Sequence, residues 1–146
     1  MDRRKFIATT CLSCMSGGLL LAFEGCGTAS KLISADIAGS DMLVPLSEFE
    51  HKKGGKIDFR KYVVVQNDLL KYPICVYRFS DTQFEALWMR CTHQGTELQV
   101  FGDKMQCPAH GSEFNNHGQV VNGPAASPLR TFPVTISEHQ LSISLK

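Results

Sequence analysis

Two short segments, each pairing a cysteine with a histidine, constrain this sequence more than any other feature. The first is Cys91-Thr92-His93-Gln94-Gly95 and the second is Cys107-Pro108-Ala109-His110-Gly111-Ser112. Thirteen residues lie between His93 and Cys107, and they show the pattern of a strand, a tight Gly102-Asp103 turn and a second strand. Because a hairpin brings its two ends side by side, the two thiols and the two imidazoles are expected to converge.

This set of side chains narrows the chemistry of the site. Thiolate and imidazole ligands suit zinc, iron or an iron–sulfur cluster. Gly95 and Gly111 stand beside the ligands, where a residue without a side chain lets the backbone approach a bulky group closely. Two cysteines and two histidines on separate loops form one known ligand set for a [2Fe–2S] cluster. A structural zinc site with the same four ligands is the alternative.

The two segments resemble the Rieske [2Fe–2S] family, whose signature is C-x-H and C-x-x-H separated by a hairpin. The match continues through residues 111–114 and 118–129, and the resemblance as a whole spans residues 41–146. It implies that the chain binds one [2Fe–2S] cluster. It also implies that the chain transfers one electron at a time and makes no bond to a substrate.

By this resemblance, four side chains are metal ligands. Cys91 and Cys107 are expected to hold the inner iron, and His93 and His110 are expected to hold the outer iron near the surface. A neutral imidazole leaves the cluster less negative than a thiolate would, so the histidines raise its reduction potential. The electron is expected to enter or leave through the exposed imidazole edge.

The resemblance assigns roles to three more residues and also shows two departures. Ser112 is expected to donate a hydrogen bond toward a cluster sulfur, and Gly123-Pro124 is expected to start a loop that covers the cluster. Phe114 stands where high-potential members carry a tyrosine donor, which predicts a lower, intermediate potential. Thr96 and Ala109 stand where members of the cytochrome bc type carry a disulfide between the cluster loops, so no such bridge is expected.

Short strand patterns dominate the sequence after residue 41. Residues 62–65 and 74–77 are dense in β-branched and aromatic residues, and residues 141–145 alternate strictly between apolar and polar. The fold class expected is all-β, a Rieske-type antiparallel β-sandwich with a cluster-binding subdomain of two hairpin loops. A signal or anchor segment is expected to precede it.

The first thirty residues have the layout of an export signal. A basic Arg3-Arg4-Lys5 start is followed by residues 6–23, which include no charged residue. The start resembles the twin-arginine signal family, so residues 1–30 are predicted to be an export signal or signal-anchor. Residues 31–40 are predicted to be a tether and residues 41–146 the Rieske domain. Membrane attachment through the N-terminal segment or a lipidated Cys26 remains open.

These features together predict a small exported electron carrier at the periplasmic or outer face of the cytoplasmic membrane. The alternative is the Rieske subunit of a larger membrane or periplasmic oxidoreductase, either cytochrome bc-like or an oxidase small subunit. The expected partners are redox proteins, namely a cytochrome, a quinol-linked protein or an oxidase component. No catalytic residue is assigned, because outer-sphere electron transfer needs none.

The charge pattern gives no support to a nucleic-acid partner. The formal net charge is +1, and residues 31–146 hold 12 Lys and Arg against 12 Asp and Glu, which is not the basic balance that nucleic acid requires. The local concentration of positive charge is a predicted loop around Gly54-Gly55 with five basic residues: Lys52, Lys53, Lys56, Arg60 and Lys61. A solvated loop is expected there, and a docking patch for an acidic partner is the alternative.

Overall fold

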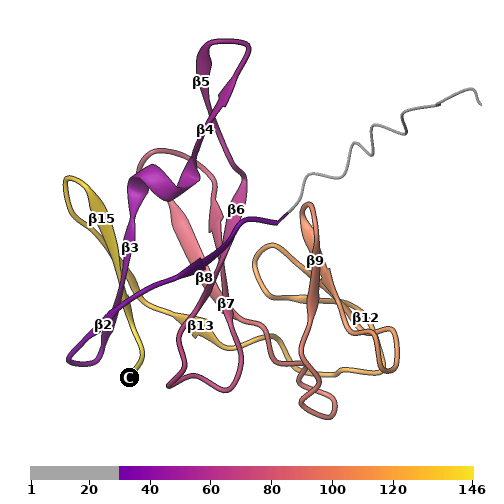
Figure 1. The fold of residues 1–146 in the computed structure, drawn as a ribbon. Coiled ribbons are helices and arrows are strands. Elements are labelled where there is room, and N and C mark those ends of the chain that lie inside the picture. Colours follow the sequence, from indigo (N-terminus) through magenta and orange to yellow (C-terminus); the bar gives the residue numbers. More distant parts are fainter. Residues whose placement is uncertain (1–29) are drawn as a thin grey trace, which may run out of the picture.

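The computed structural model describes residues 30–146, so Cys26 and nearly all of the predicted export signal lie outside the described residues. Within residues 30–146 the chain is built from strands, with one short 3-10 helix, η1 (Leu46–Phe49). Two sheets form a sandwich, a third sheet forms a subdomain beside it, and a two-stranded hairpin projects from the sandwich at the top of the view (Figure 1). The predicted all-β fold class is confirmed.

The strands fall into four sheets. The first has the order β1 (Leu32–Ser34), β6 (Tyr62–Gln66), β7 (Ile74–Arg78), β8 (Phe84–Trp88), β13 (Thr131–Phe132). The second has the order β14 (Val134–Ile136), β15 (Gln140–Ser144), β3 (Asp41–Pro45), β2 (Ile37–Ala38). The third has the order β12 (Val120–Asn122), β11 (Glu113–Asn115), β10 (Lys104–Gln106), β9 (Gln99–Phe101), and the hairpin pairs β4 (Glu50–Lys53) with β5 (Lys56–Phe59).

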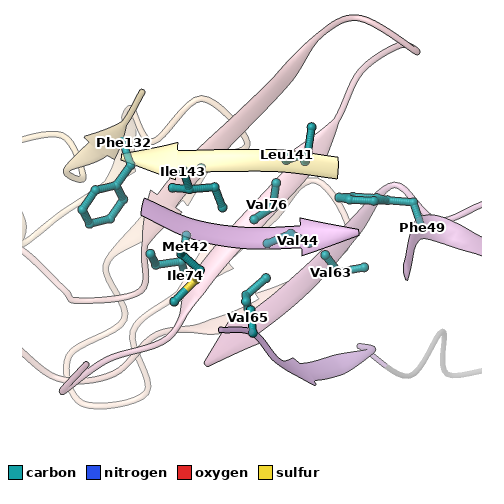
Figure 2. Packing of buried hydrophobic residues seen from close by; sticks show 12 residues of the cluster. Met42, Val44, Phe49, Val63, Val65, Ile74, Val76, Phe132, Leu141 and Ile143 are labelled. Carbon is teal, nitrogen blue, oxygen red and sulfur yellow. The ribbon is translucent and has the colours of Figure 1, made fainter. Parts of the chain in front are cut away.

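Strand β7 is buried on both faces, and through it two hydrophobic cores share one sheet. Successive side chains of a strand point to opposite faces. Ile74 and Val76 therefore enter the core between the two sandwich sheets, where they meet β3 and β15 (Figure 2). Cys75 and Tyr77 enter a second core on the other face, which also holds both candidate ligand cysteines. The sandwich thus supports the candidate site directly.

The second core also contains Cys75, which lies outside the two cysteine–histidine segments. Its side chain is fully buried in the second core, and it is a free thiol. Burial raises the pKa of this thiol, because the low dielectric of the core disfavours the thiolate. Cys75 therefore packs as a small apolar residue and stays outside the metal chemistry.

The prediction that residues 31–40 form a tether is wrong. Strand β1 pairs in parallel with β6, and β2 pairs with β3, so both belong to the sandwich. Ala35, between them, is buried in the first core. The small residues of this segment gave no strand pattern, because the partner that stabilises β1 lies about thirty residues further along the chain. The folded part therefore begins before Asp41.

The predicted basic loop is a regular hairpin. Residues Glu50–Lys53 pair with Lys56–Phe59 around a Gly54-Gly55 turn, in which both glycines have positive φ. The hairpin extends away from the sandwich at the top of Figure 1. Among residues 30–146, no helix is long and apolar enough to cross a membrane.

Candidate metal centre

The two cysteine–histidine segments lie in loops at the open end of the β9–β10 hairpin. Loop 1 (residues 91–96) connects β8 to β9, and loop 2 (residues 107–112) connects β10 to β11. In loop 1 the N–H of Cys91 donates to the carbonyl oxygen of Thr96 at 2.8 Å. The N–H of Gly95 donates back to the carbonyl oxygen of Cys91 at 2.9 Å. The loop is thus closed by two backbone hydrogen bonds around its cysteine.

Loop 2 repeats this pattern at equivalent positions. The N–H of Cys107 donates to the carbonyl oxygen of Ser112 at 2.8 Å, and the N–H of Gly111 donates to the carbonyl oxygen of Cys107 at 3.0 Å. Gly95 and Gly111 occupy the same place in the two loops, with φ of 75° and 78°. Glycine is required there because side chains rarely tolerate this left-handed conformation. The shared spacing of Cys and Gly encodes one loop conformation twice.

The two ligand cysteines are buried side by side. Cys91 and Cys107 are 1% and 2% exposed, and both are free thiols. Burial raises the pKa of the Cys107 thiol. Hydrogen bonds from the backbone N–H groups of Ala109 and His110, and from the side chains of Cys91 and Thr96, outweigh burial and lower the pKa below its ordinary value. These hydrogen bonds therefore favour the thiolate of Cys107, and the thiolate is the form that binds metal.

The two imidazoles lie at the surface beside each other. The ring centroids of His93 and His110 are 5.0 Å apart, and the ring planes are nearly perpendicular at 87°. Both residues are exposed, whereas the cysteines beneath them are buried. The hairpin therefore brings all four predicted ligands to one end of the molecule, with the thiols inside and the imidazoles outside.

The pairing of like ligands is what a two-iron cluster requires. In a Rieske centre two histidines replace two cysteines on one of the two irons, so each iron takes a like pair. The donor set, with buried thiols and exposed imidazoles on two matching loops, fits a [2Fe–2S] cluster.

A third loop (residues 123–129) ties the two ligand loops together. The hydroxyl of Thr92 in loop 1 donates to the carbonyl oxygen of Ser127 at 2.7 Å. The N–H of Ala125 donates to the hydroxyl oxygen of Ser112 in loop 2 at 3.0 Å. Loop 3 thus bridges loops 1 and 2 in a chain that has no disulfide among its described cysteines. Sequence reasoning did not assign Thr92, because only the fold brings it to loop 3.

Ser112 ends loop 2, and Gly123-Pro124 begins loop 3. Ser112 is fully buried, and its oxygen accepts the hydrogen bond from Ala125, so its own proton is left to donate elsewhere. Gly123 and Pro124 are exposed at the start of loop 3, and the peptide bond between them is cis. Loop 3 contributes the buried Ala125 rather than Pro124 to the core of the site.

The two departures from the family pattern also lie at the site. Phe114 on β11 is fully buried in the same core as the two ligand cysteines. Thr96 at the end of loop 1 is one of the groups that hydrogen-bond to the thiol of Cys107 in loop 2. A hydroxyl contact between the loops therefore stands where a disulfide cysteine was noted as missing. The sequence showed the replacement but gave no sign of the contact.

Loop 1 has one more support, which comes from the sandwich. The hydroxyl of Tyr72 donates to the carbonyl oxygen of Gly95 at 2.5 Å, and the Tyr72 ring packs edge-on against Trp88. Tyr72 lies before β7 in the chain, so sequence spacing gave no signal of this contact. Loop 1 is therefore held by the sandwich as well as by loop 3.

Comparison with known proteins identifies the family. A profile of the Rieske [2Fe-2S] domain matches residues 50–133. The cytochrome b6-f complex iron-sulfur subunit of Cyanothece sp. (strain PCC 7425 / ATCC 29141) is 31% identical over 134 residues, which is 88% of this chain and 65% of the relative. Ferredoxin CarAc of Metapseudomonas resinovorans is 36% identical over 76 residues, which is 49% of this chain and 70% of the relative.

A solved structure agrees with the fold. The crystal structure of the cyanobacterial plasma membrane Rieske protein PetC3 from Synechocystis PCC 6803 aligns with a TM-score of 0.50 at 28% identity. The alignment covers 57% of this chain and 86% of that protein. The chain spans 65% of the Cyanothece subunit and 32% of the related subunit 1 of Synechocystis sp. (strain ATCC 27184 / PCC 6803 / Kazusa). It therefore matches a part of these longer relatives.

Proposed function

The chain belongs to the Rieske [2Fe–2S] family, and on that basis we propose that it works as a small exported one-electron carrier. In this proposal Cys91 and Cys107 bind one iron of the single cluster, and His93 and His110 bind the other. The observation that carries the assignment is the pairing of like ligands, with two buried thiols together and two exposed imidazoles 5.0 Å apart. When bound, the cluster supplies a one-electron redox site.

In this proposal the thiols, the hydroxyl groups and the imidazoles of the site have different roles. The buried thiols hold one side of the cluster away from water, which limits its hydrolysis and oxidation. In this proposal the hydroxyl groups of Ser112 and Thr96 donate toward sulfur, which is supported by the free proton of Ser112 and by the hydrogen bond of Thr96 to Cys107. Donors of this kind favour the more negative reduced state. The exposed edges of His93 and His110 form the contact surface through which a partner exchanges the electron.

Pulsed electron paramagnetic resonance tests the ligand assignment. The reduced protein should show coupling to two inequivalent nitrogens, one from His93 and one from His110, because each imidazole binds the same iron from a different loop. In His110→Cys one of these couplings should disappear while iron remains bound. Unchanged nitrogen couplings in that variant would remove His110 from the ligand set.

The alternative function is that of a Rieske subunit in a larger membrane or periplasmic oxidoreductase. One observation favours it, namely that relatives of this chain are named iron-sulfur subunits of the cytochrome b6-f complex. The twin-arginine-like start, with Arg3 and Arg4, is compatible with both readings. The two proposals differ in whether the protein is bound stably to other subunits.

Two experiments on the native host separate these readings. A tagged chain purified gently from whole membranes should be recovered without stoichiometric partners if it is a carrier, and with a fixed set of subunits if it belongs to a complex. Export is tested by cell fractionation of the wild type and of Arg3→Lys/Arg4→Lys. The double variant should accumulate in the cytoplasm, and unaltered distribution would contradict export by the twin-arginine route.

A further inference from the structure

Positive charge is concentrated in one part of the fold. Residues 50–61 hold five Lys and Arg against two Asp and Glu, whereas the rest of residues 31–146 hold seven against ten. These twelve residues form the projecting β4–β5 hairpin and the two residues that connect it to β6 (Figure 1). A chain that is neutral over its folded part therefore has a positive end, and that end is the hairpin.

The register of the hairpin sorts its side chains onto two faces. On one face His51 lies opposite Asp58, and Lys53 lies opposite Lys56. Like charges directly opposite each other in an antiparallel pair are destabilising. The Lys53–Lys56 pair at the tip therefore favours an external anion. The other face pairs Lys52 with Ile57, and Ile57 is 60% exposed.

A pocket of about 330 Å³ lies at the base of the hairpin, on the side of the Lys53 face. Its basic side chains come from β4 and from the segment that follows β5, while β5 itself contributes Asp58 and Phe59. The turn of the β9–β10 hairpin closes one side of it through Gly102. Four nitrogen-bearing side chains and two hydroxyl side chains line it: His51, Lys53, Arg60, Lys61, Ser30 and Tyr62.

Few acidic groups within residues 30–146 neutralise the basic side chains of this pocket. Lys53 and Arg60 make no ion pair with the described residues, and the Arg60 Nε and His51 Nδ1 atoms are buried without a hydrogen-bond partner. Asp58 is the acidic residue in the pocket, 3.6 Å from the His51 Nε2 atom. Lys61 reaches Asp103 across an exposed 3.5 Å contact. Buried donors without partners are costly, so the pocket is built to receive an anion.

The hydroxyl groups in the pocket complete the recognition of a phosphoryl group. Arg and Lys bind phosphate oxygens through charge-assisted hydrogen bonds, and hydroxyl groups add neutral donors. The Ser30 and Tyr62 hydroxyls are 3.3 Å apart. Ser30 also lies seven residues after Phe23, the last residue of the uncharged stretch 6–23, so a fully extended chain spans at most about 25 Å between them.

We propose that this pocket binds the phosphoryl head group of an anionic lipid, so that the β4–β5 hairpin rests on the membrane surface. Two observations favour a lipid over an acidic protein. The pocket lies where the chain continues toward its most apolar segment, and the exposed Ile57 beside the lysines can enter the head-group region. Anionic membranes attract basic segments by about 1 kcal/mol for each Lys or Arg near the surface.

This contact orients the redox site. The turn of the β9–β10 hairpin lines the pocket, while loops 1 and 2 lie at the open end of that hairpin. From Gly102 to Cys107 is five residues, or about 16 Å along a strand. With the hairpin on the membrane, the exposed imidazoles of His93 and His110 point away from the lipid, toward a partner that approaches from the aqueous side.

Hydrogen exchange on the full chain in lipid nanodiscs tests the proposal without reference to the cluster. Nanodiscs of phosphatidylcholine alone are compared with nanodiscs that also contain phosphatidylglycerol. The amides of residues 50–61 are expected to exchange more slowly, by about tenfold or more, in the discs with phosphatidylglycerol. Lys53→Gln/Arg60→Gln should lose this protection. The control Lys71→Gln/Lys146→Gln removes the same charge elsewhere and should keep it.

Several outcomes would overturn the proposal. Equal exchange in both kinds of disc, or equal loss of protection in the control variant, would show that no specific lipid site exists. Protection by inorganic phosphate in phosphatidylcholine discs, equal to that by phosphatidylglycerol, would assign the pocket to free phosphate. Protection by polyglutamate with none by phosphatidylglycerol would assign the hairpin to an acidic protein.

Discussion

Loop 1 and loop 2 have the same backbone but are held in different ways. Each closes on its cysteine through the same two hydrogen bonds, and each turns at a glycine of positive φ. Loop 1 is fixed by the sandwich through Tyr72 and by loop 3 through Thr92. Loop 2 is joined to loop 3 through Ser112. The loop conformation is thus local, whereas the alignment of the two ligand pairs depends on contacts from elsewhere in the fold.

The largest expected effect is the loss of the cluster. Cys91→Ser and Cys107→Ser should each reduce bound iron and sulfide to about a tenth of the wild-type content or less, because a serine oxygen is a poor ligand for a soft iron–sulfur site. Cys75→Ala is the matched control, since Cys75 is buried in the same core but is not a ligand. Iron and sulfide analysis of the purified variants gives the answer. Equal retention in all three variants would contradict the ligand assignment.

Substitution of the two loop glycines should destabilise the protein to different degrees. Gly95→Ala and Gly111→Ala should each cost about 1–2 kcal/mol, because alanine is strained at this φ. Gly95→Ala should be the worse, since its Cβ would lie 3.2 Å from the Arg90 Nε atom, whereas the space beside Gly111 is open. Thermal unfolding, followed by the visible absorption of the cluster, should show midpoints lowered by about 4–8 °C. A larger decrease in Gly111→Ala than in Gly95→Ala would contradict the expected difference between the two loops.

Hydrogen bonds to sulfur should tune the reduction potential. Thr96→Val removes a hydroxyl donor to Cys107 and should lower the potential by roughly 40 mV, the equivalent of about 1 kcal/mol for one electron. Thr96→Ser is the control and should stay near the wild type. Phe114→Tyr adds a further hydroxyl to those of Ser112 and Thr96 and should raise the potential. Redox titration of the three variants measures these shifts, and no change in Thr96→Val would remove Thr96 from the donors.

The smallest expected effect concerns the contact between loops 1 and 3. Thr92→Val removes the hydrogen bond to Ser127 and should cost about 0.5–1.5 kcal/mol of local stability. The cluster should then be lost faster to an iron chelator, because loop 3 opens more often. Thr92→Ser retains the hydroxyl and should behave as the wild type. Identical rates in both variants would show that loop 3 does not depend on this contact.

What the sequence predicted well was encoded locally. The spacing of cysteine, histidine and glycine specified the two loops, and the alternation in residues 141–145 specified a strand with one buried face, as β15 shows. The hairpin between the loops was also predicted, because its Gly102-Asp103 turn lies between two short strand patterns. In each case the signal and the structure lie within a few residues of one another.

What the sequence did not predict depends on distant partners. Strand β1 is stabilised by β6, and the hydroxyl of Tyr72 finds its acceptor 23 residues away in loop 1. The β4–β5 hairpin was taken for a loop, because its strands are exposed along their length and lack the alternation of a half-buried strand. The contact of Thr96 with Cys107 was not predicted either, because it exists only when both loops have folded.

The most direct test of the central claim is an electron paramagnetic resonance spectrum of the dithionite-reduced protein, with iron, sulfide and zinc measured on the same sample. The account predicts a Rieske-type spectrum with two irons and two sulfides per chain, as one [2Fe–2S] cluster requires. A silent spectrum with one zinc per chain, in protein isolated from its own host, would contradict it and assign the four side chains to a structural zinc site.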